Sequence, residues 1–279
     1  MLYAWCRYCD DVIDGQELGF AVGGAVPALQ RDRALEHITT ATREALAGRA
    51  ERPEFVALQR VVEDAAIPHR HPMELIEGFA MDVAGRRYQS LEDTLEYCYH
   101  VAGVVGVMMA HVMGVRDRAT LERAQDLGIA FQLTNIARDV LDDWRAGRVY
   151  LPREFLDAEG LADADIGDPV HRDSLAKVVA RLLAVADTYY DSAREGLPAL
   201  PLRCAWAVAA ARVIYRDIGT LVRQRGEDAW TTRASVGRAR KTAALAEGLS
   251  SALASRLPRA VRPPPRPPTL WTKQDLAAS

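Results

Sequence analysis

The segment GIAFQLTNIARDVLDD, residues Gly128 to Asp143, decides the fold of this chain because its apolar residues recur with helical spacing. On a helix of about 3.6 residues per turn, a single stripe carries its small, amide and carboxylate residues in order: Gly128, Gln132, Asn135, Asp139 and Asp143. Carboxylates enclosed on such a helix cost on the order of several kcal/mol unless a cation or a water-filled cavity lies beside them. The segment therefore predicts a long helix that borders a metal site or a polar cavity. Angle alone does not choose between Asp142 and Asp143 as the partner of Asp139.

A second acidic cluster, DDVID at residues 10–14, lies near the start of the chain in another helical pattern. Helical angle places Asp10 and Asp14 on one stripe with Tyr3 and Arg7, and it turns Asp11 well away. Like charges one turn apart destabilise a helix unless something positive lies between them. Mg²⁺ that stays partly hydrated and bridges to a phosphate suits this sparse set of oxygen ligands, so we expect a magnesium site. The simpler alternative for either cluster is a solvated charged face.

The composition excludes several partners and locations. At 279 residues and 49% hydrophobic content, the chain is long enough for one or at most two domains with a large core. A net charge of −3 gives no global basic field, so nucleic acid is not an expected partner. Charged residues interrupt the start of the chain, which argues against a signal peptide, and the longest apolar run, 101–115, is too short to span a bilayer. We therefore expect a cytoplasmic protein.

The cysteines point to the same compartment. The chain has 4 cysteines, too few and too scattered for a disulfide framework, which indicates a reducing environment. Cys6 and Cys9 form a CxxC pair, but no second pair and no nearby histidine completes a zinc site. We interpret both as ordinary helix residues.

Helical patterns dominate the chain, and no convincing alternating strand is present. Apolar residues recur at spacings of three and four over 2–15, 28–48, 54–65, 73–84, 92–114, 118–145, 172–195, 202–224 and 237–255, with glycine and proline between these segments. The end of the chain is too rich in proline for a helix. We predict one helical domain over 1–258 and an extended, proline-rich tail over 259–279 at the surface.

The segment Tyr97 to Val115 is apolar on nearly all sides. Its small residues share one face that allows a close approach by another helix or by a slender ligand: Ala102, Gly103, Gly106, Ala110 and Gly114. Core packing is the simpler interpretation of most of these positions. The alternative is a tunnel for a long apolar molecule. The acidic stripes favour it, because they indicate a phosphorylated head group whose apolar tail must be enclosed.

Three blocks of the sequence resemble the squalene and phytoene synthase family in family order and spacing. They are AWCRYCDDVID from Ala4, YCYHVAGVVG from Tyr97 and LGIAFQLTNIARDVLDDWRAGRVYLP from Leu127. The resemblance spans almost the whole chain and implies an all-α isoprenoid synthase fold, a helical bundle around a central cavity. Family members normally carry a further segment before the first helix, so we expect the chain to lack that part of the pocket.

The resemblance also implies a role for individual residues. The metal ligands would be Asp10 and Asp14 in the first motif and Asn135, Asp139 and Asp143 in the second, with Mg²⁺ as the ion and Mn²⁺ as the alternative. The other expected site residues are Arg7, Gln132, Arg138 and Arg240 at the diphosphate, Tyr3, Tyr97 and Tyr215 near the reacting carbons, and Val101, Ala102, Val105 and Gly106 in the cavity wall. Arg148, Tyr150 and Pro152 match a closing motif that would order the loop after the second acidic cluster.

The activity implied by the resemblance is a magnesium-dependent prenyl transfer without NADPH. Two geranylgeranyl diphosphates would condense head to head through a cyclopropyl diphosphate to phytoene, the first committed step of carotenoid biosynthesis. The enzymatic alternative is a dehydrosqualene or presqualene diphosphate synthase that uses farnesyl diphosphate.

Two alternatives belong to other classes of protein. A catalytically inactive assembly factor of the same family would be expected to lose acidic residues, whereas both clusters are intact here. A helical structural protein with calcium-stabilised acidic faces would bind metal without turnover. We also expect peripheral membrane contact for release of a forty-carbon product, and the sequence does not specify an oligomeric state.

Overall fold

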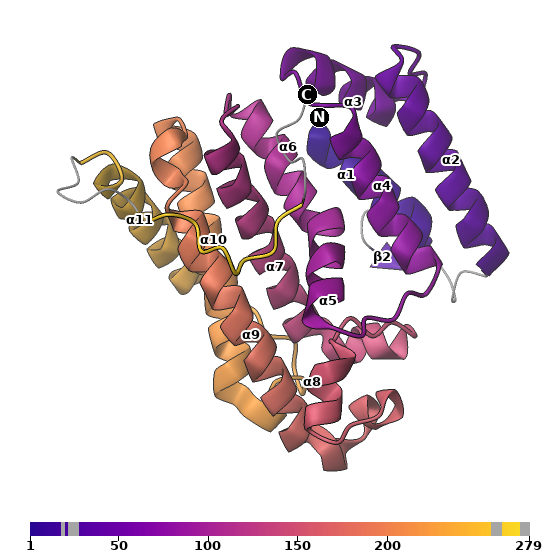
Figure 1. Ribbon diagram of the computed structural model, residues 1–279, viewed down its shortest axis with the longest axis vertical. Coiled ribbons are helices and arrows are strands. Elements are labelled where there is room, and N and C mark those ends of the chain that lie inside the picture. The colour runs from indigo at the N-terminus through magenta and orange to yellow at the C-terminus, as the bar shows by residue number, and fades with distance from the viewer. Residues whose placement is uncertain (18–19, 22–27, 258–263, 274–279) are drawn as a thin grey trace.

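The computed structural model describes residues 1–17, 20–21, 28–257 and 264–273, and these are almost entirely helical (Figure 1). The predicted all-α class is confirmed. One small difference lies after the first helix, where β1 (Gln16–Glu17) pairs antiparallel with β2 (Phe20–Ala21). Strands of this length are too short to produce a recognisable alternation in the sequence.

The helices follow one another with short connections. They are α1 (Leu2–Asp14), α2 (Ala28–Leu46), α3 (Pro53–Asp64), α4 (Arg70–Val83), α5 (Leu91–Cys98), α6 (Val104–Val112), α7 (Arg118–Arg145), α8 (Arg153–Ala158), α9 (Arg172–Arg194), α10 (Leu202–Arg225) and α11 (Arg238–Ala254). A π-helical turn, η1 (Tyr99–Gly103), joins α5 to α6. Short 3₁₀ turns are η2 (Asp163–Gly167), η3 (Pro169–His171), η4 (Leu197–Ala199) and η5 (Gly226–Asp228).

The longest helix, α7, lies at the centre of the bundle between α6 and α9 (Figure 1). The Asp117 side chain accepts a hydrogen bond from the Thr120 backbone N–H and so caps its N-terminus. At its other end, Gly147 adopts a left-handed φ of 81° that leads the chain out of the helix. Residues of one face, including Ile129, Leu133 and Ile136, are buried in the core, which leaves the polar stripe on a different face.

Close packing of η1 and α6 against α7 depends on two glycines. A Cβ atom on Gly106 would lie 2.4 Å from the Ala124 carbonyl oxygen, and a Cβ on Gly128 would lie 2.3 Å from the Ala102 carbonyl oxygen. The small-residue face predicted between residues 102 and 114 therefore admits a neighbouring helix here. The same region also borders a cavity, described below.

The last described segment, residues 264–273, contains no helix or strand and crosses the bundle from the α11 side toward α7, with a turn at 268–270 (yellow in Figure 1). We call it the C-terminal strap. Its Leu270 side chain is buried. The other parts of the predicted tail, 259–263 and 274–279, lie outside the described residues. Among the helices that the structure describes, none is long and apolar enough to cross a bilayer.

Candidate active site

A cavity of about 940 Å³ lies between α1, α4, η1, α6, α7 and α10. Its character changes along α7. Near the C-terminal end of that helix the lining is polar and includes Asn135, Asp139 and Asp143, whereas near the N-terminal half it includes Ala124 and Leu127. The cavity therefore offers a polar end for a charged head group and an apolar end for a hydrocarbon tail.

Helix α1 supplies the first pair of carboxylates because its apolar residues face the core. Trp5, Cys9 and Ile13 are buried, and the remaining face turns Asp10 and Asp14 toward the cavity. Arg148 Nη2 lies 2.5 Å from an oxygen of Asp14 and forms an ion pair with it. Burial, followed by the nearby charge of Asp14, raises the pKa of Asp10 to about 6.

The predicted separation of Asp10 from Asp11 is visible in the structure. Arg7 contacts both carboxylates, at 3.0 Å from Asp10 and 2.6 Å from Asp11, but of these two only Asp10 lines the cavity. The neighbouring Cys6 and Cys9 are free thiols. Burial raises the pKa of the Cys6 thiol to about 12, which agrees with their interpretation as helix residues with no thiolate chemistry.

Helix α7 supplies the second pair of carboxylates. Burial opposes ionisation of Asp139, but hydrogen bonds from Arg138 and Arg233 prevail and hold the pKa of Asp139 below its usual value. Burial and the adjacent Asp139 raise the pKa of Asp143 to about 7. Asp142 is exposed, pairs with Arg145 at 2.9 Å and does not line the cavity. The structure therefore places Asp143, not Asp142, with Asp139.

The residues between these helices fit a hard divalent cation. The Oδ1 atom of Asn135 is buried and has no hydrogen-bond partner, although the atom is a good ligand for such an ion. Burial raises the pKa values of Asp10 and Asp143, and a cation beside these carboxylates would oppose that effect. Within the described part of the chain, no three or more acidic, histidine or cysteine side chains are gathered closely enough to hold a metal by themselves. Arginines instead hold Asp14 and Asp139.

Asp82 on α4 is a cavity residue that sequence reasoning missed. It accepts hydrogen bonds from the hydroxyls of Tyr97, at 3.1 Å, and Tyr150, at 2.8 Å. The rings of these tyrosines stack with centroids 4.7 Å apart, and burial raises the pKa of Asp82. A sequence signal existed, because Asp82 is a single acidic residue in the apolar run FAMDVAG.

Most of the expected site residues meet at this cavity. The lining includes Tyr3, Arg7, Tyr97, Val101, Ala102, Val105, Gly106, Gln132, Arg138 and Tyr215 as well as the expected metal ligands. Tyr215 stacks on Phe131 with centroids 4.3 Å apart, whereas Tyr3 is 77% exposed at the edge. The closing motif links helices: Arg148 bonds Asp14 of α1 and Tyr150 bonds Asp82 of α4. Pro152 of the same motif precedes α8 as its N-cap residue.

Arg240 is the exception among the expected residues, because the structure does not bring it to the cavity. Its guanidinium bonds Asp217 at 2.7 Å and also Glu247, and these acceptors keep it between α10 and α11. A basic residue that was not expected at the acidic stripe is Arg233, whose Nε and Nη2 atoms each lie 3.0 Å from an oxygen of Asp139. Arg233 lies in an irregular segment before α11, where no periodic pattern indicates direction.

The sequence profile of squalene/phytoene synthase matches residues 1–240 of the chain. The chain belongs to the squalene/phytoene synthase family. A 15-cis-phytoene synthase of Enterobacter agglomerans is 49% identical over 274 residues, which cover 98% of this chain and 91% of the relative. A 15-cis-phytoene synthase of a Paracoccus species is 52% identical over 262 residues, covering 93% of this chain and 84% of the relative.

Solved structures of the squalene/phytoene synthase family share this fold. A dehydrosqualene synthase crystallised with a ligand superposes with a TM-score of 0.77 at 27% identity, over 91% of this chain and 85% of that structure. The predicted isoprenoid synthase fold is thereby confirmed. Family membership also makes this chain an enzyme of the prenyltransferase type.

Proposed function

We propose that this protein is a phytoene synthase, which joins two geranylgeranyl diphosphates head to head through a cyclopropyl diphosphate. The observation that carries the proposal is the arrangement of two acidic stripes, on α1 and α7, at one end of a largely apolar cavity of about 940 Å³. The two curated relatives described above support geranylgeranyl over farnesyl chemistry because both bear the name 15-cis-phytoene synthase. The intact acidic stripes argue against an inactive assembly factor.

The same residues that fit a hard cation would hold Mg²⁺, with Mn²⁺ as the alternative ion: Asp10, Asp14, Asn135, Asp139 and Asp143. When bound, the ion neutralises diphosphate charge and so makes the diphosphate a better leaving group. This assignment follows the oxygen donors and the unpartnered Oδ1 atom of Asn135.

Basic side chains of the polar end would bind the diphosphate. Arg7, Arg138, Arg148 and Arg233 all line the cavity beside a carboxylate. Guanidinium groups are suited to diphosphate oxygens because their donors form parallel hydrogen bonds. Each of these arginines forms an ion pair with an aspartate, and a metal diphosphate would offer its cation to the carboxylates and its anion to the guanidinium groups.

The remaining lining would protect and guide the allylic cation left by the departing diphosphate. Apolar residues around Val101, Val105 and Leu127 exclude water, which would otherwise quench the cation. The Tyr97 and Tyr215 rings can stabilise positive charge by about 0.5 to 2 kcal/mol each through their quadrupoles. Asp82 accepts the Tyr97 hydroxyl hydrogen and so fixes that ring. Loss of a proton completes the hydrocarbon, so the reaction requires no NADPH.

Product analysis tests the proposal directly. Purified protein is incubated with Mg²⁺ and radiolabelled geranylgeranyl or farnesyl diphosphate, with and without NADPH, and the extracted hydrocarbon is identified. We expect phytoene, independent of NADPH and abolished by EDTA. Asp10→Ala and Asp139→Ala should lose turnover and keep their helicity by circular dichroism. Dehydrosqualene as the main product would establish the farnesyl alternative, and metal binding without any lipid product would establish a structural role.

We also propose that the protein is cytoplasmic and touches a membrane peripherally to release its hydrocarbon product. Exposed apolar side chains on neighbouring helices supply a candidate face: Leu202 and Trp206 on α10, and Leu245, Leu249 and Leu253 on α11. Trp206 Nε1 donates to the Leu245 carbonyl oxygen, so the two helices present one continuous surface. Co-sedimentation with lipid vesicles measures this contact, and absence of binding at any lipid composition would contradict it.

A further inference from the structure

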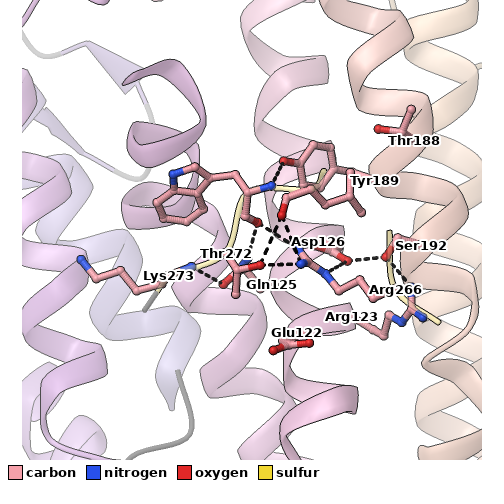
Figure 2. A network of polar contacts seen from close by, with 12 residues as sticks. Glu122, Arg123, Gln125, Asp126, Thr188, Tyr189, Ser192, Arg266, Thr272 and Lys273 are labelled. Carbon is pink, nitrogen blue, oxygen red and sulfur yellow. Dashed lines mark hydrogen bonds and ion pairs between the residues drawn. The ribbon is translucent and has the colours of Figure 1, made fainter. Parts of the chain in front are cut away.

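The C-terminal strap is anchored by a buried ion pair at α7. Nη2 of Arg266 lies 2.6 Å from one oxygen of Asp126, and its Nε lies 2.9 Å from the other (Figure 2). Asp126 is 0% exposed. A fully buried carboxylate needs a cation and hydrogen bonds to remain ionised, and Arg266 supplies both. The strap is therefore a required partner of the helix and not a loosely attached end.

The network continues from Asp126 to a residue of the cavity wall (Figure 2). Ser192 on α9 donates to Asp126, and Arg123 Nη1 donates to Ser192 Oγ at 2.7 Å. Arg123 Nη2 donates to the carbonyl oxygen of Pro264 in the strap at 3.1 Å. Both bonds hold the guanidinium of Arg123 on the strap side.

Arg123 nonetheless lines the cavity. Its Cβ and Cγ atoms lie close to Gly196, another lining residue, where an added Cβ would come within 2.9 Å of the arginine stem. Since the head is held by Ser192 and Pro264, the aliphatic stem is the part that forms the wall. The wall stays apolar only while these acceptors hold the charge outside.

The position of Arg123 along α7 assigns it to the far end of the cavity. Arg123 lies about 24 Å along the helix axis from Asp139 at 1.5 Å per residue. Its lining neighbours are mostly apolar, including Leu127, Leu197 and Leu200, with Thr120 as the polar exception among the neighbours on α7. A prenyl diphosphate bound at the aspartates would direct the last isoprene unit of its tail toward this region.

The strap also contacts η1, the turn that borders the cavity. The Trp271 ring lies 5.4 Å from the Tyr99 ring, and its backbone N–H donates to the Tyr189 hydroxyl at 2.9 Å. Gln125 donates to the Trp271 carbonyl oxygen. Tyr99 begins η1, the turn that presents Val101 and Ala102 to the cavity. One short segment thus contacts α7, α9 and η1.

We propose that Arg123 determines prenyl chain length and that Arg266 is a positioning residue for it. By holding the Arg123 guanidinium outside, the strap keeps the cavity long enough for a twenty-carbon chain. When the strap is released, the charged head is free to enter the apolar end, where it occupies the place of the last isoprene unit. A fifteen-carbon chain does not reach that place. The inference rests on the proposed function.

The test compares two substrates in the full-length protein. For Arg266→Ala we expect kcat/KM with geranylgeranyl diphosphate to fall by about tenfold or more, while kcat/KM with farnesyl diphosphate changes by less than about threefold. Adding Arg123→Leu to Arg266→Ala should restore geranylgeranyl turnover, since no charged head remains to enter the cavity. Arg266→Lys should lose less than Arg266→Ala.

Two further variants separate positioning from general destabilisation. Arg216→Ala is the matched control, because Arg216 also forms ion pairs with carboxylates, those of Asp187 and Asp191, but does not line the cavity. It should leave the ratio of the two substrates unchanged. If Arg266→Ala does not fold, the pair Asp126→Asn and Arg266→Met removes the unpaired buried charge and should show the same loss of geranylgeranyl preference.

The outcomes distinguish the inference from the function on which it rests. An equal loss with both substrates, or no restoration by Arg123→Leu, would overturn the role of Arg123 and leave phytoene synthesis intact. A wild-type protein that converts neither substrate would overturn the proposed function itself. The inference would be established if Arg266→Ala shifts the substrate preference toward farnesyl diphosphate and the added Arg123→Leu reverses that shift.

Discussion

At the polar end of the cavity, burial raises the pKa values of the aspartates, and hydrogen bonds from arginine side chains lower them. Asp139 receives hydrogen bonds from two arginines and keeps a low pKa, whereas burial raises the pKa of Asp143, one turn away, to about 7. Helical angle placed both on the correct side of α7 but left Asp142 as an equal candidate. The structure separates them, because only the packing of neighbouring elements determines which side of the stripe is enclosed.

The raised pKa of Asp143 gives a prediction about stability in the absence of metal. Between the ordinary aspartate value near 4 and about 7, the folded protein retains a proton at Asp143 that the unfolded chain has lost, so this contribution to stability falls as pH rises. We expect Asp143→Asn to raise the free energy of unfolding by roughly 1 to 3 kcal/mol at pH 8, with the gain shrinking toward pH 5. Urea denaturation in EDTA at both pH values measures this. A gain that grows toward acid pH would contradict the assigned cause.

Arg233 gives a second prediction at this scale. It lines the cavity but is largely exposed, so its ion pair with Asp139 contributes little to stability. We expect Arg233→Ala to change the free energy of unfolding by less than about 0.5 kcal/mol, yet to raise KM for the prenyl diphosphate about tenfold through the loss of a charge-assisted hydrogen bond. Steady-state kinetics and thermal unfolding measure the two effects.

The control for Arg233 is Arg225→Ala. Arg225 donates to Thr232, just before Arg233 in the sequence, and does not line the cavity. An equal rise of KM in both variants would show that order in this segment, and not the charge of Arg233, supports binding.

At the level of elements, sequence periodicity predicted the helices well where amphipathic patterns are long. The segment predicted over 118–145 is observed as α7 with the same bounds. The segment predicted over 92–114 is instead divided into α5, η1 and α6. Because residues 97–115 are apolar on nearly all sides, the extra residue of a π turn leaves no mark on their pattern. Residues of η1 line the cavity, so the sequence pattern did not predict a turn that shapes the site.

The crossing of η1 and α7 gives a graded prediction. A Cβ on Gly128 would meet the Ala102 carbonyl oxygen at 2.3 Å, whereas a Cβ on Gly103 would meet the edge of the Tyr99 ring at 3.1 Å. Backbone yields less readily than a side chain, so Gly128→Ala should lower the free energy of unfolding by about 1 to 3 kcal/mol and Gly103→Ala by clearly less. Denaturant unfolding of both variants measures the order, and the reverse order would show that the helices separate without strain.

For the whole molecule, the site joins parts of the chain that no local pattern connects. Helices α1 and α7 bring their acidic stripes to one cavity, and α4 adds Asp82 from a third region. The stripes were visible in the sequence because each is periodic by itself. The role of Asp82, the position of Arg233 and the anchoring of Arg266 could not be predicted from the sequence, because each depends on a partner far away in the chain: Tyr150, Asp139 and Asp126 respectively.

A site shared between distant helices should link ligand binding to global stability. Mg²⁺ with inorganic diphosphate, at about one hundred times its Kd, should stabilise the protein by about 2.7 kcal/mol and raise Tm by roughly 5 to 10 °C. Asp139→Asn and Asp143→Asn should lose this rise, whereas Asp142→Asn should retain it because Asp142 lies outside the cavity. Differential scanning calorimetry with and without both ligands measures the shift. An equal loss in Asp142→Asn would mean that the metal-binding face of α7 is turned from the one assigned here.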